Sequence, residues 1–464
     1  MKKNRLLSAL LLSVLLASLL ALPASAVGDG SAPAASGSAI LSSMSIQAKA
    51  AILVDDDYQE ILYEQNAHEK NYPASITKVM TTMLVIESVD RGEHSLDEVV
   101  TVGDQVELGI GSGGSGVGLK AGEQLRLEDL LYCALTASAN EACNALAQFI
   151  SGDVASFVDL MNQRAAELGM KNTHFANTHG YHDDGHYTTA YDIYLMCHEA
   201  MKHPTFRTIV SSKSHTVPAT NLHAERNLHE TNALVSTWRI TGYWYEYATG
   251  IKTGSTPEAG YCLASSATKN GKNLIAVVLG AENPKNADGS TNRLQFSESS
   301  RLLKWGFDNF SRQTILDQSA MDFPEVGVTL SSGTNYVTVQ PSGSLEATLP
   351  NDIDPGAFQR QVDLPESIEA PVQAGDKLGT VTLTYAGQEY GTLDLVATSS
   401  VERSELLYRL DRIQKFFDQL WVKLVLAAVL VLIVVLILFA LFSGRCRRRY
   451  SGSRGRRYSG RRRR

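Results

Sequence analysis

Three short motifs follow one another along this chain, and together they constrain both its fold and its chemistry. They are Ser75-Ile76-Thr77-Lys78, Ser138-Ala139-Asn140 and Lys252-Thr253-Gly254. In this order they describe an acyl-transfer site built around an activated serine. Ser75 opens an apolar run, Ile76 to Val89, that suits a buried helix, so Lys78 should lie one turn later on the same face. The third motif suits the edge of a strand.

The chemistry explains why these residue types are needed. A serine hydroxyl is a weak nucleophile until a base takes its proton, and a lysine is a base only when it is unprotonated. Burial, a nearby cation such as Lys252 and the start of a helix all favour the neutral lysine. Ser138 could relay a proton to the leaving amine, and Asn140 could bind a substrate peptide group. Lys252 and Thr253 could hold a substrate carboxylate, while Gly254 would let the substrate approach the backbone closely.

No single motif is specific. The pattern S-x-x-K occurs a second time as Ser266-Ala267-Thr268-Lys269. Ser266 ends an apolar stretch, Gly260 to Ser265, that reads as a strand, so we treat this match as background. Small polar triplets such as Ser138-Ala139-Asn140 are also common at helix ends. The joint order of the three motifs is what favours a catalytic interpretation.

These motifs lie in a longer stretch, from about Ala48 to Ala397, that resembles the D-alanyl-D-alanine carboxypeptidases, which are low-molecular-mass penicillin-binding proteins. The segments that carry the resemblance are Pro73 to Lys78, Leu135 to Ala142, Asn177 to Gly180, His186 to Asp192, Gly250 to Gly254 and Glu258 to Cys262. The resemblance implies the α+β fold of penicillin-binding proteins and serine β-lactamases. It also implies a catalytic site without a metal or cofactor.

By the same resemblance, each motif residue has an expected role. Ser75 would be the acylated nucleophile and Lys78 its base, while Ser138 and Asn140 would form the second wall. The strand that binds the terminal carboxylate would carry Lys252, Thr253 and Gly254. The N–H groups of Ser75 and Ser255 would form the oxyanion hole. Two neighbours depart from the family pattern. Glu141 stands where Asp is frequent, which we expect to be tolerated. Ser255 stands where His or Tyr is common, which should affect substrate fit and rate rather than mechanism.

The two ends of the chain carry targeting signals. Three cations, an apolar run from Leu6 to Leu22 and the small residues Ala24-Ser25-Ala26 predict a secretory signal peptide. Near the other end, Leu424 to Phe442 is an uninterrupted apolar run of 19 residues, which predicts a membrane span. Eleven arginines follow this run, so the positive-inside rule predicts a cytoplasmic tail and an outer enzyme domain.

Charge is strongly segregated along the chain. Without the eleven tail arginines the formal charge of −7 becomes −18, and without the three signal-peptide cations it becomes −21. Such an acidic ectodomain does not suggest nucleic-acid binding. For the tail, anionic lipid headgroups are the nearer partner, although a nucleic-acid role stays open. Cys446, among these arginines, is a weak lipidation candidate, and the other cysteines are expected to be free, buried thiols.

The pattern of apolar and polar residues divides the rest of the chain into domains. Paired strands around Ala50 to Glu64 and Tyr261 to Leu279 enclose helical stretches, including Leu127 to Leu146 and a closing helix Gln295 to Phe310, which predicts an antiparallel sheet covered by helices. Short alternating runs from Pro324 to Val396 predict a small all-β domain. The expected divisions are 1–26 (signal peptide), 27–46 (flexible leader), 47–318 (serine carboxypeptidase domain), 319–400 (all-β domain), 401–422 (amphipathic juxtamembrane helix), 423–443 (transmembrane helix) and 444–464 (Arg-rich cytoplasmic tail).

Other functions remain alternatives at this point. The donors in the loop His179 to His186 could suggest zinc, but they lack the helical spacing of a zinc hydrolase motif. A β-lactamase would need a further group to activate water, and no convincing glutamate motif lies between Asn140 and Lys252. A non-catalytic wall-binding protein would have no chemical reason to keep all three motifs.

The sequence therefore predicts a serine-type carboxypeptidase that removes the terminal D-alanine from peptidoglycan stem peptides and is trapped by β-lactams. Endopeptidase or transpeptidase action on cross-links is the alternative within the same mechanism, and the sequence does not decide between them.

Overall fold

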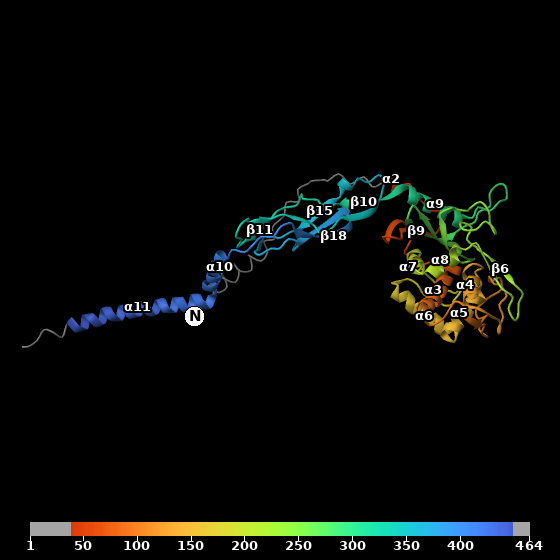
Figure 1. The fold of residues 1–464 in the computed structure, drawn as a ribbon, viewed down its shortest axis with the longest axis horizontal. Coiled ribbons are helices and arrows are strands. Elements are labelled where there is room, and N and C mark those ends of the chain that lie inside the picture. The colour runs from red at the N-terminus through yellow and green to blue at the C-terminus, as the bar shows by residue number, and fades with distance from the viewer. Residues whose placement is uncertain (1–38, 449–464) are drawn as a thin grey trace, which may run out of the picture.

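The computed structural model describes residues 39–448 of the chain (Figure 1). The predicted signal peptide, most of the predicted leader and the end of the arginine tail lie outside the described residues. Along the long axis in Figure 1, a lobe of helices around a sheet is followed by a slender β region and then by two helices, α10 and α11. A short helix, α2 (Ala39–Ser42), precedes the first strand.

The centre of the lobe is a five-stranded antiparallel sheet. Its order is β2 (Glu60–Gln65), β1 (Ala50–Asp55), β9 (Lys272–Ala281), β8 (Gly260–Lys269) and β7 (Ala248–Thr256). Both faces are covered, because alternate residues of one strand enter different cores: Ile52 and Val54 join one apolar cluster, and Ala51 and Leu53 join the other. The edge strand β7 carries the Lys252-Thr253-Gly254 motif.

One face of this sheet packs against a group of helices. They are α3 (Lys78–Asp90), α4 (Leu127–Leu135), α5 (Asn140–Ser151), α6 (Val154–Glu167), α7 (Ala190–Ala200) and α8 (Pro204–Ser211). The other face packs against α9 (Leu294–Asn309). Two small hairpins, β3 (Val99–Thr101) with β4 (Gln124–Arg126) and β5 (Ser214–Val217) with β6 (Arg226–His229), border the lobe. The expected strand pairs, closing helix and α+β class are thus confirmed.

The expected helical stretch Leu127 to Leu146 is wrong in one respect. It is two helices, α4 and α5, and between them Ser138 has a φ of 61°. A left-handed residue cannot continue a right-handed helix, so the chain turns here. The turn sets Ser138 in the wall of a cavity that Ser75 also lines. Cys133 and Cys143 consequently lie on different helices; both are free and buried, as are Cys197 and Cys262.

The β region begins earlier than the expected residue 319. Its first strand, β10 (Phe310–Leu316), directly follows α9 and pairs with β14 (Leu345–Pro350). We assign β10 to the β region because Ile315 and Leu316 belong to the third apolar core rather than to the cores of the lobe. The remaining strands are β11 (Val326–Thr329), β12 (Tyr336–Val337), β13 (Val339–Pro341), β15 (Gln359–Asp363), β16 (Ser367–Glu369), β17 (Lys377–Tyr385) and β18 (Gln388–Ala397). They form small sheets around this core, with a 3-10 turn, η2 (Pro355–Ala357), before β15.

Polar contacts join the lobe to the β region. Arg312 of β10 donates to Glu60 Oε1 of β2 at 2.9 Å, and the backbone N–H of Thr348 donates to the other oxygen of Glu60 at 2.6 Å. The Thr348 hydroxyl also donates to the buried carboxylate of Asp55 at 2.9 Å. These contacts tie strand β14 to the outer edge of the central sheet.

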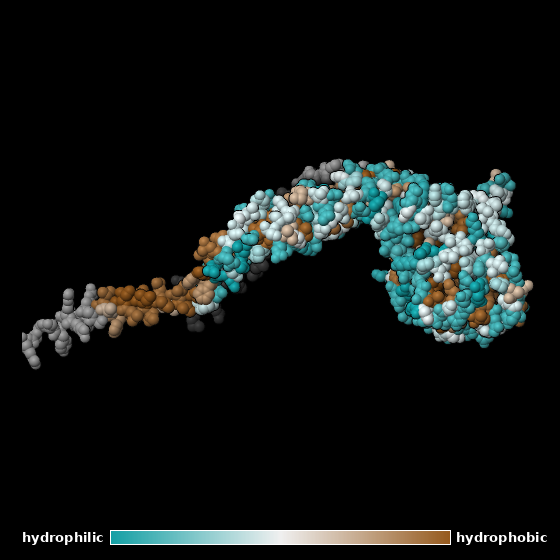
Figure 2. Space-filling model, viewed as in Figure 1, coloured by the Kyte–Doolittle hydropathy of each residue, from teal (hydrophilic) through white to brown (hydrophobic). Residues whose placement is uncertain are grey.

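The described chain ends in two helices. α10 (Glu405–Asp418) is capped by the Ser404 hydroxyl and exposes Leu410, Ile413 and Phe417, as expected for an amphipathic helix. α11 (Leu420–Arg448) contains the segment Leu420–Leu441, the one described helix that is long and apolar enough to cross a membrane. Figure 2 shows it as an almost continuous apolar surface, in contrast to the mixed surface of the rest.

Candidate active site

The S-x-x-K motif turns from a 3-10 helix into an α-helix. Ser75 lies in η1 (Ala74–Thr77), and Lys78 is the first residue of α3. This geometry places Lys78 Nζ 2.8 Å from Ser75 Oγ, within reach for a proton transfer. The second S-x-x-K match is different, because Ser266 is a buried residue of β8 whose hydroxyl bonds to that of Thr249 at 2.8 Å.

Lys78 is fully buried, and its surroundings favour the neutral amine. The pKa of Lys78 is lowered to about 7, chiefly by burial and also by the positive charge of Lys252, while the Coulombic influence of Cys143 and Glu141 opposes the shift. The second contact of Nζ is the carbonyl oxygen of His179 at 2.7 Å. A neutral Lys78 can still donate to this carbonyl and accept the proton of Ser75 with its lone pair.

The turn around Ser138 forms the second wall. Asn140 begins α5, and its backbone N–H donates to the carbonyl of Ser115 at 2.9 Å. Ser115 belongs to a glycine-rich loop, residues 109–118. Next to Asn140, the carboxylate of Glu141 accepts the N–H groups of Val117 at 2.6 Å and Gly118 at 2.9 Å. The residue that departs from the family pattern thus anchors the loop that faces Ser75.

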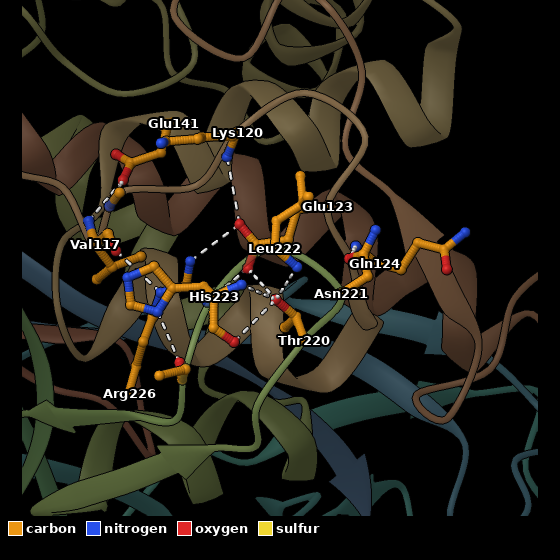
Figure 3. A network of polar contacts seen from close by, with 12 residues as sticks. Val117, Lys120, Glu123, Gln124, Glu141, Thr220, Asn221, Leu222, His223 and Arg226 are labelled. Atoms are coloured by element: carbon orange, nitrogen blue, oxygen red, sulfur yellow. Dashed lines mark hydrogen bonds and ion pairs between the residues drawn. The ribbon is translucent and has the colours of Figure 1, made fainter.

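Figure 3 shows how the same loop is held from its other side. Arg226 of β6 donates through Nε to the carbonyl of Val117 at 3.0 Å, and its two terminal nitrogens donate to Glu123 at 2.6 and 3.0 Å. Glu123 also accepts the Thr220 hydroxyl at 2.8 Å. Both members of this ion pair are buried, so the pair is a fixed point against which the loop is positioned.

The third motif forms the facing wall on β7. Lys252 is fully buried, and its Nζ donates to the carbonyl of Thr253 at 3.1 Å. Burial lowers the pKa of Lys252 and raises that of Glu230, while their mutual attraction opposes both shifts. The Thr253 hydroxyl shares a hydrogen bond with that of Thr231 at 2.7 Å. Thr253 lines the cavity beside Ser75, whereas the fully buried Lys252 is not among the residues that line it.

Two glycines allow neighbouring segments to approach η1. A Cβ on Gly254 would lie 2.8 Å from the carbonyl oxygen of Pro73 and 3.1 Å from the N atom of Ser75. A Cβ on Gly180, which has a φ of 83°, would collide with the carbonyl of Ala74. The requirement for glycine at 254 therefore comes first from packing against the nucleophile turn, a reason that the sequence did not reveal.

Two histidines of the loop 179–186, His179 and His186, have hydrogen-bond partners inside the protein. His186 accepts the N–H of Ala176 at 3.0 Å through Nδ1, and its Nε2 lies 2.7 Å from the Thr77 hydroxyl. His179 accepts the N–H of Tyr181 at 3.1 Å. Burial lowers the pKa of both rings to about 3, so both are neutral. Their nitrogens brace the loop behind Ser75 and are not directed at a common point for zinc.

Elsewhere in the described residues, one group of side chains has the proximity needed to hold a metal: Glu87, Glu199 and His203. Arg164 already donates to Glu87 at 2.8 Å and to Glu199 at 2.9 Å, so a cation occupies their shared space.

Two hollows meet at Ser75. The larger, about 410 Å³, lies between the glycine-rich loop and the segment 255–258, with Asn140 and Tyr181 in its wall. The smaller, about 230 Å³, is lined by Ser138 and Thr253 and by two arginines, Arg239 and Arg293. Ser255 borders both. Both arginines lie in segments without a motif and could not be predicted as site residues, because only the fold brings them to the site.

Comparison with known proteins agrees with this geometry. Residues 37–283 match the D-alanyl-D-alanine carboxypeptidase family of peptidases. The chain belongs to this family. Residues 329–403 match the C-terminal domain of penicillin-binding protein 5. The motifs predicted the fold of penicillin-binding proteins and the enzyme class of serine-type D-Ala-D-Ala carboxypeptidases, and both predictions are confirmed.

Characterised members of the carboxypeptidase family match over most of their length. The D-alanyl-D-alanine carboxypeptidase DacC of Escherichia coli is 32% identical over 391 residues, which cover 81% of this chain and 87% of the relative. DacF of Bacillus subtilis is 29% identical over 372 residues, covering 80% and 90%. Among solved structures, penicillin-binding protein 5 from Haemophilus influenzae superposes with a TM-score of 0.58 at 28% identity, covering 78% of this chain and 99% of that one.

Proposed function

We propose that this protein removes the terminal D-alanine from peptidoglycan stem peptides through an acyl-enzyme on Ser75. The observation that carries the proposal is the 2.8 Å contact between Ser75 Oγ and the Nζ of a fully buried Lys78, at the meeting point of two hollows. Membership of the D-alanyl-D-alanine carboxypeptidase family supplies the substrate class.

The proposed reaction uses groups of the chain throughout. Lys78 accepts the Ser75 proton as Oγ attacks the carbonyl of the penultimate D-alanine. The N–H groups of Ser75 and Ser255 receive the oxyanion. The proton taken by Lys78 then returns through the hydroxyl of Ser138, which lines the same cavity as Ser75, to the leaving amine, so that Lys78 and Ser138 are both neutral again. D-alanine departs, and water then hydrolyses the ester to release the shortened peptide and free Ser75.

The arginines of the smaller hollow favour a carboxypeptidase over an endopeptidase. Arg239 and Arg293 offer two cations beside the Thr253 hydroxyl, where the free carboxylate of a terminal D-alanine would lie. A cross-link through the side-chain amine of a lysine has no free carboxylate at this place. Cleavage of cross-links and transpeptidation use the same acyl-enzyme and remain the second candidates.

β-Lactams would acylate the same serine. A β-lactamase needs a further group that activates the deacylating water, and no convincing glutamate motif for one lies between Asn140 and Lys252, so we expect the penicilloyl enzyme to persist.

We further propose that α11 anchors the protein in the cell membrane with the lobe outside the cytoplasm. The arginines after the apolar segment and the predicted signal peptide support this orientation. In this arrangement the β region of about residues 310–400 would hold the active site away from the membrane, and α10 would lie at its surface.

The test is D-alanine release from a synthetic stem pentapeptide by the purified protein, with Ser75→Ala as control. Release by the wild type alone supports the proposal. Arg239→Ala then separates the two candidates: it should raise KM for the pentapeptide while leaving hydrolysis of a dimer cross-linked through lysine unchanged. Release by Ser75→Ala, or activity on the dimer alone, would overturn the proposal.

A further inference from the structure

Two tryptophans of one loop, here called the Trp loop (residues 236–247), face the solvent. Trp238 is 64% exposed and Trp244 is 55% exposed. Tryptophan is the largest side chain and is usually well buried, so two exposed rings on one loop need a reason. The chain's other tryptophans have one: Trp305 packs in a core, and Trp421 begins the apolar helix α11.

The loop is firmly held, so the exposure does not come from loose packing. The ring of Trp238 stacks on His229 of β6 with centroids 3.5 Å apart and planes inclined by 4°. The backbone N–H of Tyr245 donates to the carbonyl of Leu234 at 3.0 Å, and Tyr243 Oη accepts the N–H of Arg293 at 2.9 Å. A rigid aromatic surface binds a ligand without a large ordering cost.

The tryptophans line a surface hollow of about 450 Å³ with polar side chains around it. Its wall contains both rings, His229 and Val235, together with Lys213, Ser214, Ser236 and Thr237. Flat apolar rings beside hydroxyl and ammonium groups suit a ligand that is itself apolar on its faces and polar on its edges. A pyranose ring has this character, since its axial C–H groups form apolar faces and its hydroxyl and acetamido groups lie around the edge.

This hollow adjoins the active site through two chain segments. Trp238 lines it while the next residue, Arg239, lines the smaller hollow at Ser75. Likewise His229 lines the surface hollow and Thr231 the catalytic one. Trp238 is thus the chain neighbour of Arg239, one of the two arginines proposed to receive the terminal carboxylate. The rest of a stem peptide under cleavage extends from Ser75 away from that carboxylate, so sugar at the two tryptophans would belong to a neighbouring strand.

We propose that Trp238 and Trp244 form a binding platform for wall glycan, a polymer of N-acetylated hexosamines, beside the catalytic cleft. The inference rests on the proposed function because that function brings the lobe to peptidoglycan. The platform would hold the enzyme on the wall while Ser75 acts on stems within reach. It would therefore raise activity on intact wall and leave hydrolysis of free peptides unaffected.

The first test measures binding without catalysis. The full-length Ser75→Ala protein in detergent is titrated with chitotetraose, an oligomer of N-acetylglucosamine, and tryptophan fluorescence is followed. We expect a saturable change in fluorescence that is lost in Trp238→Ala and in Trp244→Ala. The change should be kept in Trp421→Ala, the matched control, which removes an exposed tryptophan outside the lobe. Equal binding by all variants, or no binding by the parent, would overturn the platform. This titration does not depend on the proposed reaction.

The second test compares two substrates. In the catalytically intact protein, Trp238→Ala and Trp244→Ala should slow D-alanine release from purified sacculi about tenfold, the effect of about 1.4 kcal/mol of binding energy, with unchanged kcat/KM on the free pentapeptide. An equal loss on both substrates would mean that the loop acts through Arg239 and would contradict the platform. If the wild type released no D-alanine from either substrate, the proposed function would fail instead.

Discussion

The strongest prediction concerns the dependence of acylation on pH. Lys78 must be unprotonated to act as the base for Ser75, and burial lowers its pKa to about 7. The reactive fraction is then about one half at pH 7, about one tenth at pH 6 and about one hundredth at pH 5. The second-order rate of acylation by a fluorescent penicillin should therefore rise about tenfold from pH 5 to 6 and about fivefold from pH 6 to 7, and it should level off above about pH 8.

Two variants make this prediction sharper. Lys78→Arg keeps the charge, but a guanidinium is not deprotonated in this range, so acylation should be nearly abolished at every pH. Lys252→Gln removes the cation that lowers the pKa of Lys78, so the midpoint should move to higher pH whatever happens to the maximal rate. The rates are measured by stopped flow between pH 5 and 9. A profile that is flat across this range, or a midpoint that moves down in Lys252→Gln, would refute the reasoning.

Three further predictions follow from the packing around the site. Gly254→Ala would place a methyl 2.8 Å from the Pro73 carbonyl, and the displaced turn should slow acylation at least about tenfold while the far-UV circular dichroism is kept. Arg226→Met leaves the Glu123 carboxylate buried without its cation, which should lower the free energy of unfolding, measured in urea, by about 3–5 kcal/mol. The double variant Arg226→Met, Glu123→Met should recover most of this stability. No recovery would contradict the interpretation of a buried ion pair. His186 has its pKa lowered to about 3, so between pH 6.5 and 3 the unfolded chain binds a proton that the folded chain does not. Stability should fall with acidification there, by up to about 1.4 kcal/mol per pH unit, and the slope should be shallower in His186→Asn.

Features written in local sequence were predictable. The apolar run after Ser75 indicated a buried helix. The spacing of one helical turn between Ser75 and Lys78 indicated that the two side chains lie on the same face, close together. The paired apolar strands indicated an antiparallel sheet, and the Lys252-Thr253-Gly254 motif was expected at the edge of a strand; β7, an edge strand of this sheet, carries it. The length and composition of Leu424 to Phe442 indicated an apolar helix, and α11 contains this run.

Features that depend on distant parts of the chain were not predictable. The stretch Leu127 to Leu146 reads as helical, whereas in the structure Ser138 has a φ of 61° and the backbone N–H of Asn140 donates to the carbonyl of Ser115, a residue remote in sequence. Gly254 is needed because Pro73 and Ser75 approach it, and those residues are remote in sequence. Arg239 and Arg293 belong to no motif, and they reach the site through long-range folding.

The most direct measurement is to map the residue that a penicillin acylates. The full-length protein is incubated with benzylpenicillin, quenched in acid and digested, and the adduct is located by mass spectrometry. The account predicts one adduct, on Ser75, with none on the peptide that contains the second motif match at Ser266. An adduct at another residue, or an unmodified Ser75 at saturating penicillin, would contradict it.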